Sequence, residues 1–301
     1  NGSKSHVGRF RLACGAADEM PACAWLRDRM CGAKMDHKAI ADVLLAALDA
    51  KQQIAPITDA LPAFGLADAA RVQVLVTAAR TARGERIVGR KIGFTNRTIW
   101  AEYGVHAPIS GPMYDTTVAM LDGPVPLAAL IEPRIEPEIV LRLSAAPEAG
   151  MSESELMACV SHVAHGFELV QSVFPGWRFR AADTVAGFGL HGALLHGPFT
   201  EIVPGDRPTW QAALADLGVV LVQNGTVADE GRSTALLGGG PLAALSHLVG
   251  AITSDPLADP VRAGEIVTTG TLTRALPVSP GEVWETRLDG IALGGLRMQL
   301  A

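Results

Sequence analysis

The chain has 301 residues, of which 49% are hydrophobic and 19% are charged, so it can bury one large core or two modest ones and does not resemble a disordered protein. Its formal net charge of −6 disfavours nucleic acid and anionic membranes as partners. No apolar stretch is long enough to predict a membrane span. We therefore expect a globular, cytoplasmic protein that binds a small molecule.

The segment of residues 1–35 contains Arg, Cys and Gly but no long apolar stretch, and we expect an extension of uncertain order. It matches neither a secretory signal nor an organelle transit peptide. Cys14, Cys23 and Cys31 lie here at a spacing that suits no common zinc site, while Cys159 stands alone. The cysteines thus indicate unpaired thiols.

Two helices are predicted next. From Ile40 to Leu48 apolar side chains recur every three or four residues, and the same stripe returns over residues 66–81 and stops before Gly84. The two helices predict a helical N-terminal region over residues 36–84.

From residue 85 to residue 301 the chain consists of short β-rich runs separated by Gly and Pro, which predicts a β-rich domain. Asn224-Gly225 lies between two such runs and predicts a tight hairpin turn. Two helices are predicted inside this region. One covers about residues 152–164 and starts with a capping box, and the other covers about residues 241–252.

Glu136 and Glu138 stand two residues apart at the entry to an apolar strand. Residues i and i+2 of a strand point to the same face, about 6.5 to 7 Å apart at Cα, so both carboxylates can converge on one cation. Glu168 is a third acid in an apolar strand, and three buried acids repel one another unless Mg²⁺ or Mn²⁺ neutralises them. From spacing alone, the alternative is that Glu136 and Glu138 are exposed on a half-solvated strand.

Lys91 stands in an apolar strand between Gly89 and Gly93, which permit close approach of a ligand or of backbone. A desolvated lysine loses its proton more easily, so Lys91 could act as an acid or base or stabilise an enolate. The alternative is that it extends into solvent from an edge strand.

Other motifs are weaker. Residues 187–192 read G-x-G-x-x-G, but Gly197 and Pro198 follow too soon for the helix of a dinucleotide site, which we reject. His162 and His165 are three residues apart in the segment predicted to be helical, and we interpret them as ordinary helix residues.

Six segments occur in an order typical of one family. They are GRKIGFT, GVHAPISGPMYD, PRIEPEI, FELVQS followed by WRFRAADTVA, NGTVADEG and GEIVTTGTL. With them the chain, from about residue 36 onward, resembles the 2-keto-4-pentenoate hydratase and 4-oxalocrotonate decarboxylase group of the fumarylacetoacetate hydrolase superfamily. The resemblance implies an α+β fold, a mixed β-roll or barrel with peripheral helices and a small helical N-terminal layer, usually assembled as a homo-oligomer.

The resemblance also implies a site. Glu136, Glu138 and Glu168 would bind a divalent metal, Mg²⁺ or Mn²⁺, and Lys91 would be the active-site lysine. Substrate contacts are expected from the following residues: Thr95, Phe188, Leu190, Thr269 and Gly270.

The implied chemistry begins with a 2-oxo acid that chelates the metal through its carboxylate and C2 oxygen, so that charge on the enolate is stabilised. A hydratase that adds water to a 2-hydroxydienoate is the leading hypothesis. The alternatives are a decarboxylase of an oxalocrotonate-like acid, a C–C hydrolase of an acylpyruvate, and a catalytically silent, metal-dependent ligand-binding protein. Hydrolysis ranks lower because no His-Glu pair in the N-terminal part offers a general base.

One segment departs from the family. Where the hydratases continue Asp-Thr-Ile/Val-Ala with Asp-Asn-Ala-Ser, this chain reads DTVAGFGLHG, so Gly187, Phe188 and Leu190 replace polar residues. The change predicts a pocket less suited to a second carboxylate or to positioning water, with His191 as a compensating proton donor.

Overall fold

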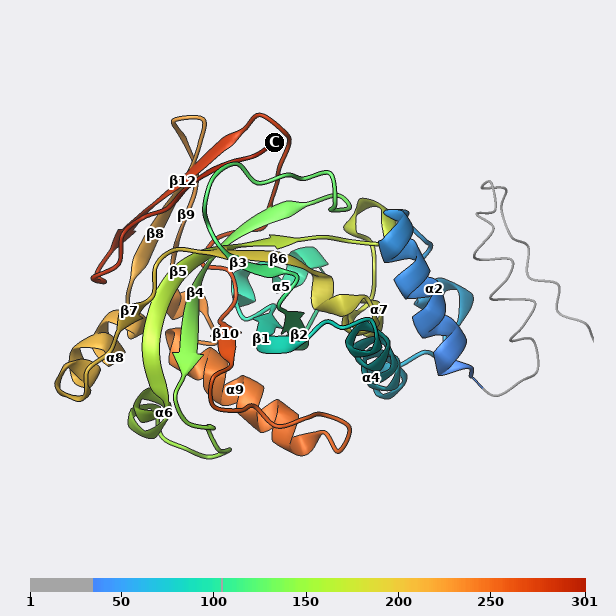
Figure 1. Ribbon diagram of the computed structural model, residues 1–301, viewed down its shortest axis with the longest axis horizontal. Coiled ribbons are helices and arrows are strands. Elements are labelled where there is room, and N and C mark those ends of the chain that lie inside the picture. The colour runs from blue at the N-terminus through green and yellow to red at the C-terminus, as the bar shows by residue number, and fades with distance from the viewer. Residues whose placement is uncertain (1–34, 104) are drawn as a thin grey trace, which may run out of the picture.

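The computed structural model describes residues 35–103 and 105–301 (Figure 1). Predictions for residues 1–34, including those for Cys14, Cys23 and Cys31, lie outside the described residues. The helices are α2 (His37–Ala50), α3 (Ile57–Ala60), α4 (Leu66–Ala82), α5 (Trp100–Tyr103), α6 (Glu153–Cys159), α7 (Ala181–Ala186), α8 (Arg207–Ala215) and α9 (Gly240–Ser254). The strands are β1 (Ile87–Gly93), β2 (Ile109–Tyr114), β3 (Val118–Met120), β4 (Arg134–Leu143), β5 (Val160–Val170), β6 (His191–His196), β7 (Thr200–Glu201), β8 (Gly218–Gln223), β9 (Thr226–Arg232), β10 (Ile266–Thr268), β11 (Leu276–Pro277), β12 (Val283–Asp289) and β13 (Arg297–Gln299). The expected α+β class is confirmed.

A large mixed sheet lies at the centre and curls into a half-barrel (Figure 1). Its strands follow the order β2-β1-β10-β4-β5-β6-β3, while β11 pairs with β4 and β7 with β5. Strand β10 lies between β1 and β4, parallel to β1 and antiparallel to β4. A strand from late in the sequence thus joins β1 to the long β4–β5 pair.

A second sheet of four antiparallel strands, in the order β13-β12-β8-β9, packs against the first. The apolar layer between them combines Ile135 and Phe167 of the large sheet with Leu221, Trp284 and Met298 of the small one, all 0% or 1% exposed. This packing covers one face of β4 and β5, so the other face is left for the residues that line the interior of the half-barrel.

Helices cover the remaining surfaces. Helices α6, α8 and α9 pack on one another and on the large sheet, with Leu245 and Leu248 of α9 fully buried. None of the helices in the described part of the chain combines the length and the apolar character of a membrane-spanning helix.

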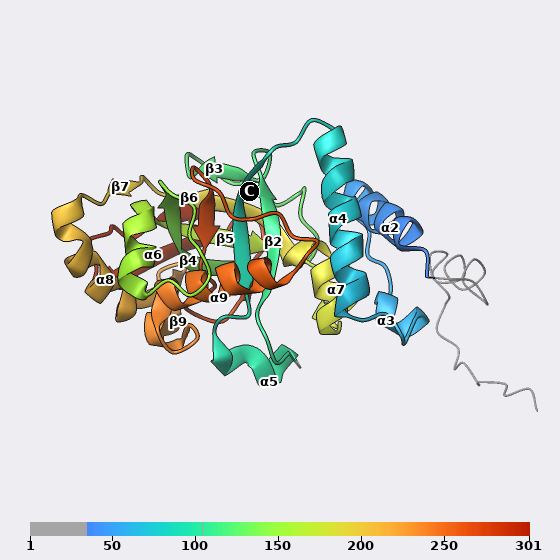
Figure 2. The same ribbon diagram turned by 90° about the horizontal axis from the view of Figure 1, so that it is seen from below.

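The N-terminal helices α2 and α4 pack together and against α7, at the end of the molecule away from α8 (Figure 2). Asp183 of α7 joins this layer to the rest of the structure. Its buried carboxylate accepts hydrogen bonds from the Thr58 backbone N–H and hydroxyl, at 3.0 and 2.7 Å, and from the Arg180 N–H at 2.8 Å. The proposed boundaries of the regions at residues 35/36 and 84/85 stay predictions.

The predicted hairpin is confirmed, because Asn224 and Gly225 have φ values of 50° and 83° and join β8 to β9. The helix predicted over residues 152–164 is wrong in its second half: α6 ends at Cys159 and the chain continues as β5. His162 and His165 therefore lie on a strand. The β-branched Val160 and Val163 suit this strand, and its long pairing with β4 outweighs the helical pattern.

The sequence pattern missed several elements. Strand β2 carries Gly111 and Pro112, which are uncommon inside strands, and α7 and α8 are short helices inside the region expected to be mostly β. Pro112 is tolerated because β2 lies at the edge of the large sheet.

Candidate metal centre and active site

Glu136 and Glu138 of β4 and Glu168 of β5 converge at one point of the large sheet. In the antiparallel register Glu136 lies directly opposite Glu168, and Glu138 follows two residues later on the same face. One carboxylate oxygen from each residue lies within 4.8 Å of the others. Glu138 and Glu168 are 0% exposed and Glu136 is 9% exposed, so the alternative of a half-solvated strand is wrong.

Lys91 of β1 reaches the same point. Its Nζ lies 3.5 Å from Glu168 Oε1, and its side chain is buried. Strand β1 is an inner strand between β2 and β10, so the alternative of a lysine extending into solvent from an edge is also wrong. Gly93 allows this position, because a Cβ there would lie 3.0 Å from the Lys91 Nζ.

Charge dominates this cluster. Burial favours the neutral form of Lys91, yet the carboxylates of Glu168, Glu136 and Glu138 outweigh it and raise the pKa of the lysine above its ordinary value. Desolvation alone would lower the pKa of Lys91, which is the direction expected from its apolar strand. In this cluster Lys91 is held as an ammonium ion.

The three acids respond differently. Burial raises the pKa of Glu136 to about 7, and burial together with Glu168 and Glu136 raises the pKa of Glu138 well above its ordinary value. For Glu168 burial acts in the same direction, but Lys91 and the hydrogen bond from His191 outweigh it and lower the pKa. By themselves the three acids cannot all be ionised, which a divalent cation would change.

Two oxygens in the cluster fit a cation directly. Glu138 Oε1 and Glu168 Oε2 are buried and have no hydrogen-bond partner among the described residues. A buried carboxylate oxygen without a partner is unfavourable, and a hard cation that prefers oxygen ligands would satisfy both atoms. The donor set therefore suits Mg²⁺ or Mn²⁺.

His191, expected as a proton donor to substrate, lies beside Glu168. Its Nδ1 lies 2.8 Å from Glu168 Oε1 and its Nε2 lies 2.9 Å from the Thr117 hydroxyl. Because an ionised carboxylate only accepts, Nδ1 carries the hydrogen of the first bond. His191 also lines a second, separate cavity together with Phe188 and Tyr114. The geometry supports a positioning role for His191 on Glu168.

Thr95, Thr269 and Gly270 form the support behind Glu138. The Gly270 N–H donates to Glu138 Oε2 at 2.9 Å, and the Thr95 hydroxyl donates to the Thr269 carbonyl at 3.0 Å. Gly270 has a φ of +93°, and a Cβ there would lie 1.7 Å from Thr95 Oγ1, so only glycine fits. The structure brings these predicted substrate contacts to the carboxylate cluster and not to the cavity wall.

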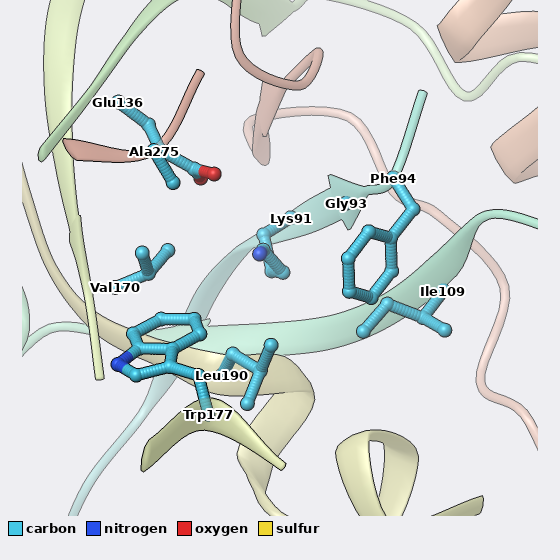
Figure 3. A pocket seen from close by; sticks show the side chains of 9 residues that line it. All are labelled: Lys91, Gly93, Phe94, Ile109, Glu136, Val170, Trp177, Leu190 and Ala275. Carbon is cyan, nitrogen blue, oxygen red and sulfur yellow. The ribbon is translucent and has the colours of Figure 1, made fainter. Parts of the chain in front are cut away.

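A cavity opens from Lys91 and Glu136 (Figure 3). It is narrow and partly open to solvent, and about 330 Å³ of non-protein space, open solvent included, lies between its lining residues. Its remaining lining is apolar and comes from Gly93, Phe94, Ile109, Val170, Trp177, Leu190 and Ala275. Of the two wall residues expected at the changed segment, Leu190 lines this cavity and Phe188 lines the second one.

Several wall residues have an unusual backbone conformation. Phe94, Trp177 and Leu190 have φ values of 55°, 58° and 62°, in the left-handed region that bulky residues rarely adopt. Phe94 and Trp177 are not among the site residues predicted from the sequence. Phe94 directly follows Gly93 in the segment that contains Lys91, and this position next to the lysine could have identified it as a site residue.

Comparison with known proteins places this site in context. No protein-family profile matches the chain. It is 31% identical over 252 residues to the 2-keto-4-pentenoate hydratase of Paraburkholderia xenovorans strain LB400, covering 83% of this chain and 90% of that one. It is 30% identical over 218 residues to a 4-oxalocrotonate decarboxylase of a Pseudomonas species, covering 71% and 79%. Among solved structures, the 4-oxalocrotonate decarboxylase from Pseudomonas putida G7, complexed with magnesium and adipate, matches with a TM-score of 0.79 and 28% identity over 88% of this chain and 97% of that one.

Proposed function

The chain belongs to the 2-keto-4-pentenoate hydratase and 4-oxalocrotonate decarboxylase group of the fumarylacetoacetate hydrolase superfamily, and on this premise we propose that it is a divalent-metal-dependent lyase. Its proposed reaction is the addition of water to a small 2-hydroxydienoate or 2-oxo-enoate acid. The observation that carries the proposal is the convergence of Glu136, Glu138 and Glu168, with two unpartnered oxygens, beside Lys91, where Lys91 and Glu136 line a cavity.

The three glutamates would hold the metal, and when bound it supplies Lewis-acid polarisation of the substrate's C2 oxygen. The protein's own part is to position and to move protons. Lys91 Nζ, held as an ammonium group, faces the cavity from beside Glu168, so it can give a proton to the bound carbon chain. His191 holds Glu168 in place, and the Gly270 N–H holds Glu138.

The second candidate is decarboxylation of an oxalocrotonate-like acid. It is favoured because the chain is about as similar to a relative named 4-oxalocrotonate decarboxylase, at 30% identity, as to one named 2-keto-4-pentenoate hydratase, at 31%. The two reactions use the same carboxylates and differ in product. Analysis of the product distinguishes them, since decarboxylation releases CO₂ and hydration adds a hydroxyl group without loss of carbon.

The experiment that tests the proposal is calorimetric titration of metal-stripped protein with Mg²⁺ and with Mn²⁺, with and without oxalate, followed by an assay with 2-hydroxypenta-2,4-dienoate. We expect metal binding, tighter binding with oxalate, and loss of the dienoate absorbance. Glu138→Ala should abolish all three, while Glu230→Gln, at an exposed acid on β9 of the small sheet, should change none. Metal binding with oxalate but no turnover of any dienoate would favour the silent ligand-binding protein.

Assembly as a homo-oligomer and a cytoplasmic location stay predictions. The first is tested by light scattering of the purified full chain, and the second by fractionation of cells that express it.

A further inference from the structure

We infer that the far end of the substrate is an uncharged, apolar group, alkyl or aryl, and not a second carboxylate. The inference rests on the proposed function, because it takes the 2-oxo acid head to lie at the carboxylate cluster. It adds the chemical class of the remainder of the substrate.

Beyond Lys91 and Glu136 the lining of the cavity is apolar. Phe94, Ile109 and Leu190 pack into one buried apolar cluster with Val105 behind them, and Trp177 packs against that cluster. Figure 3 shows these side chains surrounding the space in front of the Lys91 amine. A ligand whose head lies at the three carboxylates and whose tail extends into the cavity therefore contacts aliphatic and aromatic side chains along its length.

The charged side chains that line the cavity lie at its carboxylate end. Lys91 is the only cationic side chain among the described residues that line this cavity, and it stands at the carboxylate end. Arg134 packs over the Trp177 ring, 4.4 Å from its centroid, and its positive charge acts on Glu136 at the carboxylate end, but it does not line the cavity. A carboxylate placed among these apolar side chains would lose its hydration without gaining a partner, which disfavours its binding.

The backbone at Leu190 has an unusual conformation. Leu190 belongs to three consecutive left-handed residues, with φ values of 64°, 60° and 62° at Phe188, Gly189 and Leu190. Asn or Gly would adopt this conformation more easily than Leu. Three bulky apolar residues held in the left-handed conformation, Phe94, Trp177 and Leu190, line the same cavity, which indicates that the wall they form serves the ligand.

The test compares three probes that share the 2-oxo acid head: pyruvate, 2-oxohexanoate and 2-oxoadipate. The last two have equal carbon numbers and differ in a terminal methyl against a terminal carboxylate. Calorimetry of the full chain in saturating Mg²⁺ should show 2-oxohexanoate binding at least about tenfold more tightly than either pyruvate or 2-oxoadipate. Equal or tighter binding of 2-oxoadipate, with pyruvate bound, would overturn the inference alone. Failure of all three to bind would overturn the proposed function and the inference with it.

A matched pair of variants tests the wall itself. Leu190→Asn should reduce the preference for 2-oxohexanoate over 2-oxoadipate at least about fivefold. Leu237→Asn is the control, because Leu237 also has a left-handed backbone, with a φ of 51°, but lines a separate groove with Ser246 and His247. An unchanged preference in folded Leu190→Asn would overturn the inference, and the wild-type probe series keeps it testable if that variant does not fold.

Discussion

The two ends of the cavity are built in different ways. At the charged end, Glu136 and Glu168 lie opposite each other in a continuous antiparallel pair, and the neighbouring strands fix Lys91 beside them. At the other end, Trp177 and Leu190 come from short irregular segments with left-handed backbone. The charged groups are thus held by long-range strand pairing, while the apolar wall is held by local turns.

The difference teaches which part of the site is free to change. Moving a carboxylate would require a shift of strand register, which would turn every side chain of β4 or β5 to the opposite face. Replacing Leu190 changes one turn and leaves the sheet intact. We therefore expect head-group chemistry to be robust to substitution of the wall, and tail specificity to be sensitive to it.

The largest effect is expected from Glu138→Gln. Mg²⁺ affinity should fall at least about 100-fold, because a charged ligand is lost from a buried site. This loss exceeds the roughly 10- to 100-fold that is typical when a residue hydrogen-bonded to a metal ligand is removed. The metal-free variant should be at least as stable as the metal-free wild type, since one of three mutually repelling acids is gone. Calorimetry and thermal unfolding with and without Mg²⁺ measure both. Unchanged Mg²⁺ affinity would show that the cluster is not the metal site.

His191→Leu should have the next largest effect. Loss of the hydrogen bond to Glu168 should weaken Mg²⁺ binding about 10- to 100-fold, as is typical when a partner of a metal ligand is removed. His191→Asn retains an N–H donor and should recover part of the affinity. Equal affinities for wild type and His191→Leu would mean that Glu168 is positioned without the histidine.

A pH effect is expected from His165. Burial lowers its pKa to about 4, while its Nδ1 donates to the Glu138 carbonyl and the Thr286 hydroxyl lies 2.8 Å from its Nε2. As the pH falls from about 6.5 towards 4, His165 is protonated in the unfolded chain but stays neutral in the folded chain. The free energy of unfolding therefore decreases in that range. At pH 5 the loss from this residue should be about 2 kcal/mol.

Urea unfolding at pH 7 and pH 5 measures this effect, and His165→Gln provides the comparison. The difference between the two pH values should be smaller in the variant by about the same 2 kcal/mol. An identical pH dependence in both proteins would assign the acid sensitivity to other groups.

The smallest effect is expected at the N-terminal layer. Thr58→Val removes the hydroxyl that donates to Asp183 at 2.7 Å and leaves the backbone donors of Thr58 and Arg180 in place. Stability should fall by about 1 to 2 kcal/mol, with little change in Mg²⁺ affinity. Thermal unfolding and calorimetry check the two parts, and a large loss of metal binding would show that this layer supports the metal centre.

One part of the site could be predicted from local periodicity, whereas the full set of Glu136, Glu138, Glu168 and Lys91 could be predicted only from the resemblance to the family. The two-residue spacing of Glu136 and Glu138 places them on one face of any strand, whatever that strand pairs with. Their burial could not be predicted, since it depends on distant strands that bring Glu168 of β5 and Lys91 of β1 to the same interior point. The raised pKa of Lys91 could not be predicted either, because it depends on carboxylates that come from elsewhere in the chain.

The fold shows the same division. The hairpin at Asn224-Gly225 is set by residues that adopt positive φ, and the structure has it. The segment around His162 has a local pattern that fits a helix, and only pairing with β4 makes it a strand. The position of Trp177 follows from a turn with left-handed residues at Gly176 and Trp177, a conformation that the sequence does not predict for tryptophan.

The place of β10 has a consequence for folding order. Lys91 pairs with Thr268, and Thr268 in turn pairs with Val140, so the lysine reaches the glutamates only through a strand made more than 170 residues after it on the chain. Contacts of such high sequence separation form slowly and late. During synthesis the acids of β4 and β5 can pair well before the counter-charge of Lys91 is locked beside them. A chain that stops before residue 266 would thus keep the repelling acids without the strand that brings in their cation.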